Sequence, residues 1–351
     1  MDGVCKYFGT CGGCSLQNLA PEAYGLYKTG LLGDALDKAS LKCAEILPMI
    51  DFPTGSRMRA NLKVDYGANV GFYKGKSRDV VGVCSCQLLH PDLNGLIMPL
   101  RELFKNLVKR SAGSVAIARA DNGMAVHFGS GIGLMPLDMP AIRDFARDGK
   151  VIRVSQGNRI LFESETPMIG FGGAQIMLPM DSFLQPGHQS RLALVETVKR
   201  FTESAKPAGI ADLFCGIGFF SFSLAMPGVH VEAWDCDEFA VRNINIAANR
   251  AGLDVHARAA DLFARPVPAK KLSEFGLAIV DPPRDGAAAQ CSAIAKSRLR
   301  RLIYVSCNPK TFAKDAKVLC AAGFEILKIQ PIDQFPYTSH LEIVAKLERR
   351  N

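Results

Sequence analysis

In its second half the chain reads Ile210-Ala-Asp-Leu-Phe-Cys-Gly-Ile-Gly-Phe-Phe220, a short apolar run followed by a pair of glycines and a second apolar run. The first run has the composition of a buried parallel strand, interrupted only by the carboxylate of Asp212. Gly216 and Gly218 allow a sharp turn that brings main-chain atoms close to a ligand. The second run is apolar enough to begin a buried helix. The order strand, glycine turn, helix predicts a ligand site, because open α/β sheets bind ligands at the carboxyl ends of their strands.

A second expected strand, residues 229–235, ends in the carboxylate of Asp235. Beside the glycine turn, this carboxylate is placed to accept hydrogen bonds from ribose hydroxyls. The turn departs from the dinucleotide fingerprint, since no third glycine follows Gly218. An alternative role for Asp235 is to cap the helix expected over residues 238–250. The neighbouring glycine turn favours the ribose-binding interpretation.

Length and composition are those of an ordinary globular protein with more than one domain. The 351 residues suggest two or three compact units, and 48% hydrophobic with 22% charged residues is typical of such chains. No apolar run is long enough to cross a bilayer and the N-terminus lacks a secretion signal, so we expect no membrane association and a cytoplasmic location. The formal charge of +8 permits a polyanionic partner without requiring one.

The cysteines favour thiol chemistry or metal ligation over a disulfide framework, because the chain has 11 of them and no secretion signal. Near the start, the spacing of Cys5, Cys11 and Cys14 lets a short loop wrap several thiolates around one centre. Zinc and cubane iron–sulfur clusters usually take four ligands, so a fourth must come from elsewhere. Cys84 and Cys86 are the candidates, and the spacing alone excludes neither metal.

The region after these cysteines contains patterns typical of nucleic-acid contact. Arg57, Arg59 and Lys63 lie on or beside a strand-like segment, where they are either available to phosphates or part of an ordinary solvated edge. Residues 71–78 interleave cations with aromatic side chains, which suits single-stranded nucleic acid because bases stack and phosphates need neutralising.

The same region is expected to be rich in antiparallel strands. Residues 115–128 predict a hairpin with its turn at Asn122-Gly123. A helix is expected over residues 139–147, followed by strands over residues 151–155 and 159–163.

Further strands in the second half end in chemically active side chains. They are residues 255–259 followed by Asp261, residues 275–280 followed by Asp281, and residues 302–306 followed by Cys307. Strands alternating with helices predict an α/β protein with a doubly wound sheet, which a final antiparallel pair over 324–331 and 341–347 would complete. The glycine turn and these residues fall at one end of successive strands, where packing alone would place apolar residues.

A cysteine with a nearby carboxylate is the minimum set for methylating a ring carbon of uracil. A thiolate that adds to C6 makes C5 enolate-like, so that C5 can attack a sulfonium methyl group; a base then removes the C5 proton and the thiolate leaves. Free cysteines are more often buried structural residues than catalytic ones. Pro282, Pro283 and Pro309 favour the catalytic role, because they stiffen the loops that present Asp281 and Cys307.

Four motifs resemble, in their order, those of the RNA uracil-C5 methyltransferases, the family that makes 5-methyluridine in ribosomal and transfer RNA. They are Asp212-Leu-Phe-Cys-Gly-Ile-Gly218, Asp281-Pro-Pro-Arg284, Ser306-Cys-Asn-Pro309 and His340-Leu-Glu342. The first is similar to the first motif of class I methyltransferases that bind S-adenosylmethionine. The N-terminal cysteines match as well, so the resemblance covers nearly the whole chain.

The resemblance implies a role for each matching residue. Cys307 is expected to be the nucleophile and Glu342 the base, with Gln185 and Asp281 hydrogen-bonded to the uracil and Arg284 beside them. S-adenosylmethionine is expected to contact Gln185, Asp212, Phe214, Gly216, Gly218, Asp235, Asp261 and Asp281.

The resemblance also implies a [4Fe–4S] cluster on Cys5, Cys11, Cys14 and Cys86. The family's fourth ligand precedes a hydrophobic-x-Pro segment, which points to Cys86 over Cys84. Zinc is the alternative.

The chain departs from the family pattern at two places. The family usually has Phe-x-Gln-x-Asn where this chain has Phe183-Leu-Gln-Pro-Gly187, and many members have Pro-His-Thr where it has Pro336-Tyr-Thr338. Neither change touches the nucleophile or the base, so we expect activity. We expect no β-barrel domain ahead of Cys5, a layout that the resemblance associates with shorter members that act on 23S ribosomal RNA. We therefore expect ribosomal RNA as the substrate, with transfer RNA as the alternative.

We expect three parts and a monomer: a Cys-cluster segment over 1–46, a mostly antiparallel α+β RNA-binding domain over 47–184, and a class I methyltransferase domain over 185–351. Cytosine-C5 methylation would require a cysteine where Asp281-Pro-Pro stands. An iron–sulfur RNA-binding or ribosome-assembly factor with vestigial chemistry is an alternative of another class, against which the intact Cys307 and Glu342 speak.

Overall fold

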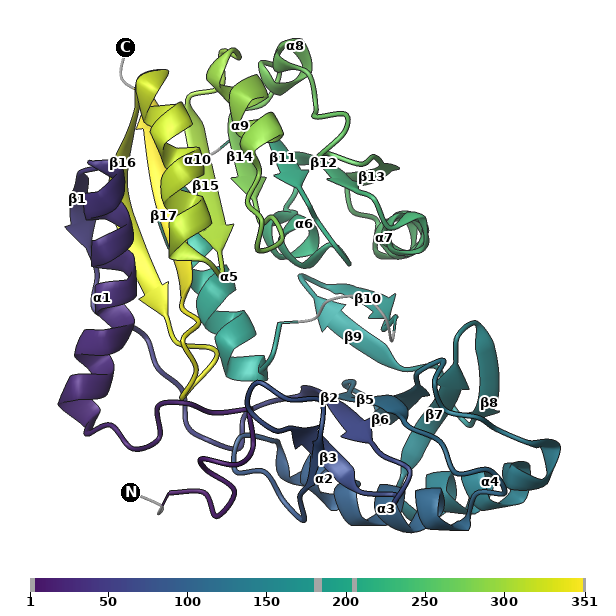
Figure 1. Cartoon of the computed structure of the whole chain (residues 1–351). Helices are drawn as coiled ribbons and strands as arrows, with labels where there is room; N and C mark the ends of the chain where they lie inside the picture. The colour runs from purple at the N-terminus through teal and green to yellow at the C-terminus, as the bar shows by residue number, and fades with distance from the viewer. Residues whose placement is uncertain (1–3, 180–184, 204–206, 350–351) are drawn as a thin grey trace.

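Two large sheets, one above the other in Figure 1, form the framework of the molecule, and a two-stranded hairpin lies between them. The computed structural model describes residues 4–179, 185–203 and 207–349. No helix in the described part of the chain is both long and apolar enough to cross a bilayer. The cytoplasmic location stays a prediction.

The eight-stranded sheet has the predicted α/β architecture. In spatial order its strands are β1 (Cys43–Ile46), β16 (Phe324–Ile332), β17 (Glu342–Arg349), β15 (Arg301–Ser306), β14 (Leu277–Val280), β11 (Gly209–Leu213), β12 (His230–Asp235) and β13 (Val255–Ala259). The strands from β15 to β13 run parallel, and β17 is antiparallel to both of its neighbours. The final antiparallel pair is therefore confirmed.

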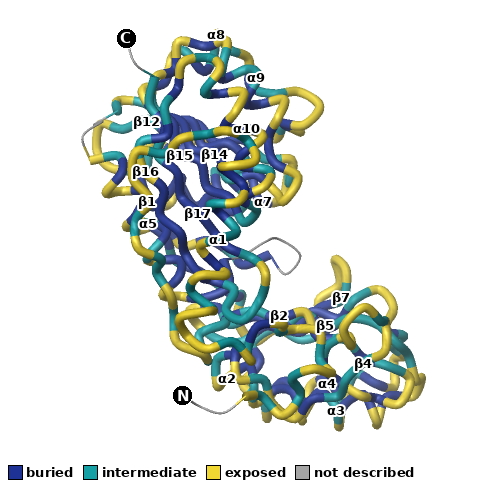
Figure 2. Tube along the Cα trace, turned by 60° about the vertical axis from the view of Figure 1, so that its left-hand side comes forward, coloured by how far each residue is buried: buried dark blue, intermediate teal, exposed yellow. Residues whose placement is uncertain are grey.

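Helices cover both faces of this sheet, because successive residues of a strand point to opposite sides. Ile210 belongs to the core on one face and Ala211 to the core on the other. The first face carries α5 (His188–Thr202), α6 (Phe219–Leu224) and α7 (Glu238–Ala251); the second carries α1 (Pro21–Ala39), α8 (Ala269–Leu272), α9 (Ala288–Ala295) and α10 (Pro309–Ala321). Figure 2 shows the strands between these layers as a continuous buried interior.

The N-terminal helix and strand belong to this sheet as well. β1 pairs in parallel with β16, and α1 packs beside α10 (Figure 1). Residues 21–46, which we assigned to the Cys-cluster segment, therefore complete the edge of the C-terminal sheet. The division into three domains itself stays a prediction.

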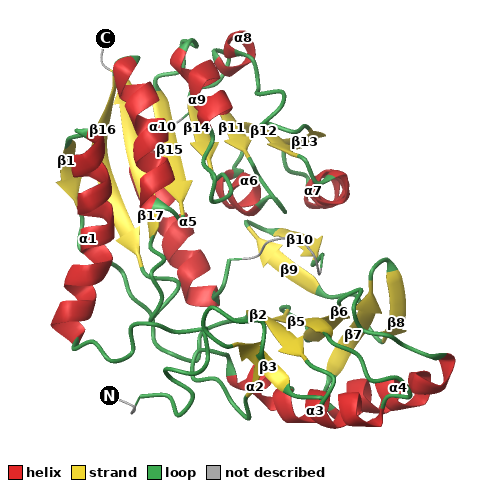
Figure 3. Cartoon of the chain, in the orientation of Figure 1, coloured by secondary structure: helices red, strands yellow, loops and turns green. Residues whose placement is uncertain are grey.

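The seven-stranded sheet is mostly antiparallel, as predicted. Its order is β4 (Val80–Gly82), β3 (Val70–Tyr73), β2 (Arg59–Val64), β5 (Gly113–Arg119), β6 (Met124–Phe128), β7 (Val151–Gln156) and β8 (Arg159–Glu163). Only β6 and β7 run parallel, because the short helix η1 (Pro136–Asp138) and α4 (Met139–Asp148) provide the crossover between them. Figure 3 shows α2 (Pro91–Gly95), α3 (Ile97–Asn106) and α4 along one face of the sheet.

The hairpin of β9 (Met168–Phe171) and β10 (Ala174–Met177) joins the two parts. Ile169 and Ile176 lie in the same core as Ile244 of α7, so the hairpin packs on the eight-stranded sheet's helical layer. Residues 180–184, which include Phe183 of the predicted uracil-binding segment, lie outside the described residues, and Gln185 lies inside them.

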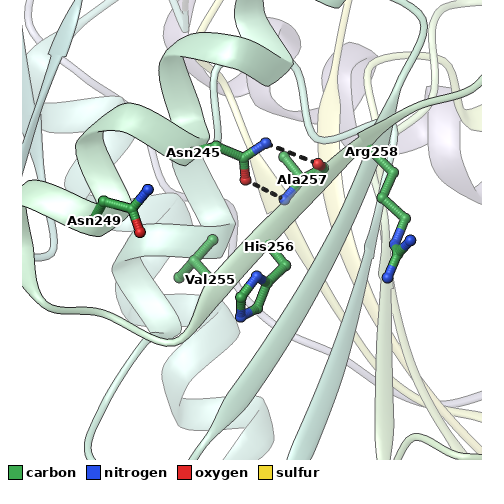
Figure 4. Close-up of a pocket in the computed structure, with 6 residues that line it drawn as sticks. All are labelled: Asn245, Asn249, Val255, His256, Ala257 and Arg258. Atoms are coloured by element: carbon green, nitrogen blue, oxygen red, sulfur yellow. Dashed lines mark hydrogen bonds between the residues drawn. The ribbon is translucent and has the colours of Figure 1, made fainter.

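Asn245 of α7 closes the edge of the eight-stranded sheet at β13. Its Nδ2 donates to the carbonyl of Ala257 (3.0 Å) and its Oδ1 accepts from the amide of the same residue (2.9 Å), as Figure 4 shows. Edge strands leave such backbone groups unpaired, so one side chain satisfies both. The hollow beside it, lined also by His256 and Arg258, contains none of the predicted site residues.

Candidate active site

A cleft of about 520 Å³ opens at the carboxyl ends of the parallel strands. Its walls include most of the predicted residues, namely Gln185, Phe214, Gly216, Asp235, Asp261, Asp281, Arg284, Cys307 and Glu342. Asp212 and Gly218 are not among its lining residues. The glycine turn, predicted to bind the cofactor, and Cys307, predicted to be the nucleophile, therefore line the same cleft.

The glycine turn bends as its composition predicts. Phe214, Gly216 and Gly218 all have positive φ, at 64°, 54° and 81°. A Cβ at Gly218 would lie 3.0 Å from side-chain atoms of Phe222 and Ile244, so this glycine serves the close packing of α6 on α7. Phe214 is unusual as a non-glycine residue in the left-handed region, a conformation that concentrates at functional sites.

An aromatic pair forms one wall of the cleft, and the sequence analysis predicted Phe214 of this pair but missed Phe263. The rings of Phe214 and Phe263 are 5.4 Å apart and both line the cleft. Flat apolar walls of this kind suit an adenine ring. The only sequence signal for Phe263 was its position two residues after the strand-tip Asp261, whose Oδ1 accepts from the amide of Phe263 (3.0 Å).

Asp235 ties the glycine turn to the start of the next helix. Its Oδ2 accepts from the amide of Gly216 (2.8 Å) and its Oδ1 from the amide of Asp237 (3.0 Å). The helix cap is Asp237, whose side chain accepts from the amides of Phe239 and Ala240. The alternative role of Asp235 as the cap is therefore wrong. A contact of Asp235 with ribose stays a prediction.

Asp212 lies beneath the cleft. It is fully buried, and Ser221 Oγ of α6 donates to its Oδ2 (2.5 Å). Burial raises the pKa of this carboxyl to about 6. Its geometry supports the turn–helix junction, and a direct contact with the cofactor stays an untested prediction.

Cys307 stands at the end of β15, where two of the motifs are bonded together. Asn308 caps α10 by accepting from the amide of Lys310 (3.2 Å), and its Nδ2 donates to the carbonyl of Arg284 (3.1 Å). Burial and then the charge of Glu342 raise the pKa of the Cys307 thiol to about 11; Arg284 opposes this by its charge and a hydrogen bond.

Glu342 and Asp281 face the same thiol. Glu342 is 2% exposed, and Gln334 Nε2 donates to its Oε2 (2.5 Å). Burial, then the charge of Asp281, raises the pKa of Glu342 well above its usual value. Burial, then the charge of Asp212, raises the pKa of Asp281 to about 7. The cleft therefore contains two carboxyl groups of different proton affinity. Asp281 titrates near pH 7, and Glu342 binds its proton more strongly than a free glutamate does.

A hydrogen bond between Arg284 and His340 links the Asp281-Pro-Pro-Arg284 motif to the His340-Leu-Glu342 motif. Arg284 Nη2 donates to His340 Nε2 (2.6 Å), and burial together with the charges of Arg284 and Lys28 lowers the pKa of His340. A neutral imidazole whose Nε2 already accepts from Arg284 has no free lone pair for a catalytic proton. This arrangement favours Glu342 over His340 as the base.

The predicted cysteines meet in a second, smaller cavity of about 50 Å³. Cys5, Cys11, Cys14 and Cys86 line it, whereas Cys84 is exposed and does not. Arg57 also lines this cavity and its guanidinium lies over the ring of Phe335 at 6.0 Å, so it stands between the cysteines and the cleft instead of at an outer phosphate-binding edge.

The geometry can now be compared with known proteins. A model of the tRNA (uracil-5-)-methyltransferase family matches residues 148–350. The chain belongs to this family. An uncharacterized RNA methyltransferase of Caulobacter vibrioides is 33% identical over 360 residues, covering 99% of this chain and 86% of that protein.

Two further relatives show how far the likeness of this uracil-5-methyltransferase reaches. The 23S rRNA (uracil(1939)-C(5))-methyltransferase RlmD of Shewanella halifaxensis is 32% identical over 364 residues, covering 99% of this chain and 82% of that protein. The crystal structure of Pyrococcus abyssi tRNA (uracil-54, C5)-methyltransferase with S-adenosyl-L-homocysteine superposes with a TM-score of 0.76 at 24% identity, over 96% of this chain and 84% of that one. The second likeness bears on the fold alone.

The family membership confirms the sequence-based reading of the activity. The chain is an S-adenosylmethionine-dependent RNA (uracil-C5-)-methyltransferase with a class I methyltransferase fold, and its partner is RNA.

Proposed function

We propose that this enzyme methylates C5 of a uridine in 23S ribosomal RNA through a covalent bond between Cys307 Sγ and C6 of the base. The convergence of Cys307, Asp281 and Glu342 on one cleft beside the glycine turn carries the proposal. A thiol and two carboxyl groups of different proton affinity are what addition, methyl transfer and proton removal require.

The end of the cleft beside the glycine turn would bind the cofactor. S-adenosylmethionine, when bound, provides an electrophilic methyl group. Asp235 would accept hydrogen bonds from its ribose hydroxyls, and Phe214 with Phe263 would enclose its adenine. Gln185 and Asp281 line the same cleft as Cys307, and the uracil ring would lie against them.

The first covalent step belongs to Cys307. Because its pKa is about 11, little thiolate exists at neutral pH, and Arg284 is the group that stabilises it. After the thiol proton has passed to solvent, Sγ bonds to C6 and the electron pair of the C5–C6 double bond moves toward C5 and the C4 carbonyl. A neutral Asp281 can donate a hydrogen bond to a uracil carbonyl and so stabilise the negative charge that develops there.

The last step belongs to Glu342. C5 takes the methyl group and still carries its hydrogen, which Glu342 removes as a proton. The electron pair of that C–H bond restores the C5–C6 double bond and expels Cys307 as a thiolate. Transfer of the proton from Glu342 to this thiolate then restores the thiol and the Glu342 carboxylate that accepts the next proton. Burial that raises the pKa of Glu342 also makes its carboxylate a stronger base.

The RNA must present an unpaired uridine. C5 and C6 of a stacked base are out of reach of a thiol at the bottom of a cleft, so the base has to be flipped out or already single-stranded. Phe335 lines the cleft and offers a surface for such a base.

We propose that the four cysteines lining the thiol cavity hold an iron–sulfur cluster in preference to a single zinc ion. Four sulfurs bound to one zinc ion at about 2.3 Å would lie roughly 3.8 Å apart. Within the described residues, no three of the four sulfurs lie within 4.8 Å of one another. A cubane, whose iron atoms stand between its thiolates, holds them farther apart. We therefore propose a [4Fe–4S] cluster on Cys5, Cys11, Cys14 and Cys86, with Arg57 offsetting part of its negative charge.

Ribosomal RNA is proposed over transfer RNA because of the likeness to RlmD. The test is a map of 5-methyluridine in 23S rRNA and in tRNA from cells with and without the gene, followed by methylation of unmodified transcripts by the purified enzyme. We expect one 23S position to lose its methyl group and the transcript of that region to regain it. Loss confined to tRNA would overturn the ribosomal assignment, and loss in neither RNA would overturn the proposal.

A further inference from the structure

Two buried polar atoms in the active-site cleft have no hydrogen-bond partner in the part of the chain that the structure describes. Arg191 is 5% exposed and its Nη1 is unpartnered; Gln185 is 6% exposed and its Oε1 is unpartnered. Both side chains line the cleft. One is a cationic donor and the other a neutral acceptor, and leaving either unpaired in the interior is unfavourable.

Arg191 is held by its surroundings with little freedom to turn away. Its guanidinium lies over the ring of Phe171 at 5.7 Å, and that ring meets the edge of Phe219, the first residue of α6, at 5.2 Å. Its Nη2 lies 3.3 Å from His188 Nδ1. The guanidinium therefore stands where the glycine turn passes into α6.

Within residues 4–179, 185–203 and 207–349, no carboxylate forms an ion pair with Arg191. Burial lowers the pKa of the guanidinium, and the charge of Asp121 opposes this. A buried cation without a counter-ion is costly, and none of the described residues provides one, so an anionic group of a bound ligand would stabilise this site.

The position of Arg191 indicates which anion. Asp235 ends β12 and Asp261 follows β13, toward one edge of the eight-stranded sheet, whereas α5, which carries Arg191, packs on β16 and β17 toward the other edge (Figure 1). With the ribose at Asp235, the amino-acid end of a bound S-adenosylmethionine would extend toward α5. That end is a zwitterion, with one carboxylate and one ammonium group.

We propose that Arg191 binds the α-carboxylate of S-adenosylmethionine and that Gln185 Oε1 accepts a hydrogen bond from its α-ammonium group. The inference rests on the proposed placement of the cofactor in this cleft. An RNA phosphate is the competing anion. Arg191 is buried among Phe171 and Phe219, and a phosphate on the outer strand would remain solvated, so the carboxylate is the better match.

The experiment compares two ligands that differ in the amino-acid end. S-adenosylhomocysteine carries the zwitterion, and 5′-methylthioadenosine has the same adenosine and sulfur without it. Calorimetry with Arg191→Gln should show S-adenosylhomocysteine binding weakened by about tenfold or more, and methylthioadenosine binding unchanged within about twofold, as expected for one lost charge-assisted hydrogen bond. Arg191→Lys keeps the charge and should fall between wild type and Arg191→Gln.

Arg200→Gln is the matched control. Arg200 lies on the same helix, bonds Gln330 Oε1 at 2.9 Å and does not line the cleft, so both ligands should bind that variant as they bind wild type. Circular dichroism establishes that each variant is folded.

Three results would overturn the inference. Equal weakening of both ligands would mean that Arg191 only supports the fold of the cleft. Unchanged S-adenosylhomocysteine binding with weaker RNA binding would assign Arg191 to a phosphate. Failure of the wild-type enzyme to bind either ligand would remove the cofactor placement itself, which the other two results leave intact.

Discussion

Lys28 Nζ lies 2.6 Å from Asp333 Oδ1, and both side chains are withdrawn from solvent although 305 residues separate them. Lys28 also donates to the carbonyls of Phe335 (3.1 Å) and His340 (2.5 Å). One ammonium group on α1 therefore holds the loop that carries Phe335 into the cleft and leads to Glu342.

Removing Lys28 should destabilise this loop and the protein. Lys28→Met leaves the Asp333 carboxylate buried without its counter-ion, although the Tyr24 hydroxyl still donates to it, and we expect a loss of about 3–5 kcal/mol in the free energy of unfolding. Lys38→Met, at an exposed position on the same helix, is the control and should change stability by less than about 0.5 kcal/mol. Denaturant unfolding of both variants measures this. A loss no greater than that of the control would show that the pair does not stabilise the fold.

Arg284 should set the reactivity of the nucleophile. Because the pKa of Cys307 is about 11, its alkylation rate should rise by about tenfold per pH unit across the neutral range. Arg284→Gln removes the group that lowers this pKa, so alkylation at any given pH below it should be slower. Mass spectrometry of the Cys307 peptide follows the rate, and exposed Cys236 in the same digest should be unaffected. A rate already independent of pH near neutrality would contradict the high pKa.

Substitutions of Cys307 and of Glu342 should block the methylation reaction at different steps. Cys307→Ala should form neither product nor a covalent complex. Glu342→Gln keeps the shape but removes the base, so it should transfer the methyl group and then stall with RNA bonded to Cys307. A denaturing gel would show this species as a protein–RNA conjugate.

Glu348→Gln, on the same strand β17 and paired with Lys346 away from the cleft, is the control for the trapped species and should turn over freely. Free turnover by Glu342→Gln as well would mean that another residue is the base, and His340 would be tested next.

Asp235 should contribute directly to cofactor binding. Asp235→Ala removes a charged acceptor and should weaken S-adenosylmethionine binding by roughly 1–3 kcal/mol in calorimetry. Asp237→Ala removes the cap of α7 and should cost stability without a comparable loss of affinity. Similar losses of affinity in both variants would reduce Asp235 to a support of the local backbone.

The two cysteines near residue 85 provide a matched pair for the cluster. Anaerobically purified enzyme should be brown and contain iron. Cys86→Ser should lose iron and destabilise the N-terminal part, whereas Cys84→Ser should keep both, because only Cys86 lines the thiol cavity. Colourless protein with one bound zinc ion per chain would favour the alternative metal.

Sequence patterns alone determined the α/β class, the parallel strands and the residues at their tips. The reason is local: a strand ends where its apolar run ends, and parallel strands bring those ends to one edge of a sheet. Asp235, Asp281 and Cys307 could therefore be placed together without knowing how the helices pack.

The tertiary structure alone decided which of these residues face the cleft and how their surroundings shift their pKa values. Asp212 lies within β11 and was predicted to contact the cofactor, yet it is buried under α6 and bonded to Ser221. Arg57 was expected at an outer edge and instead lines the thiol cavity. Such outcomes depend on helix packing and on burial, which no local pattern encodes.

Contacts between distant segments were also beyond the reach of the sequence. The pairing of β1 with β16, the ion pair of Lys28 with Asp333 and the position of Arg191 over Phe171 each join parts of the chain that carry no common motif. A periodic pattern states which face of an element is buried, and it does not state against what. The contact partners are determined only when the chain packs. Burial of apolar surface is favourable for many pairs of elements, whereas hydrogen bonds and ion pairs form only between groups at the right distance and angle.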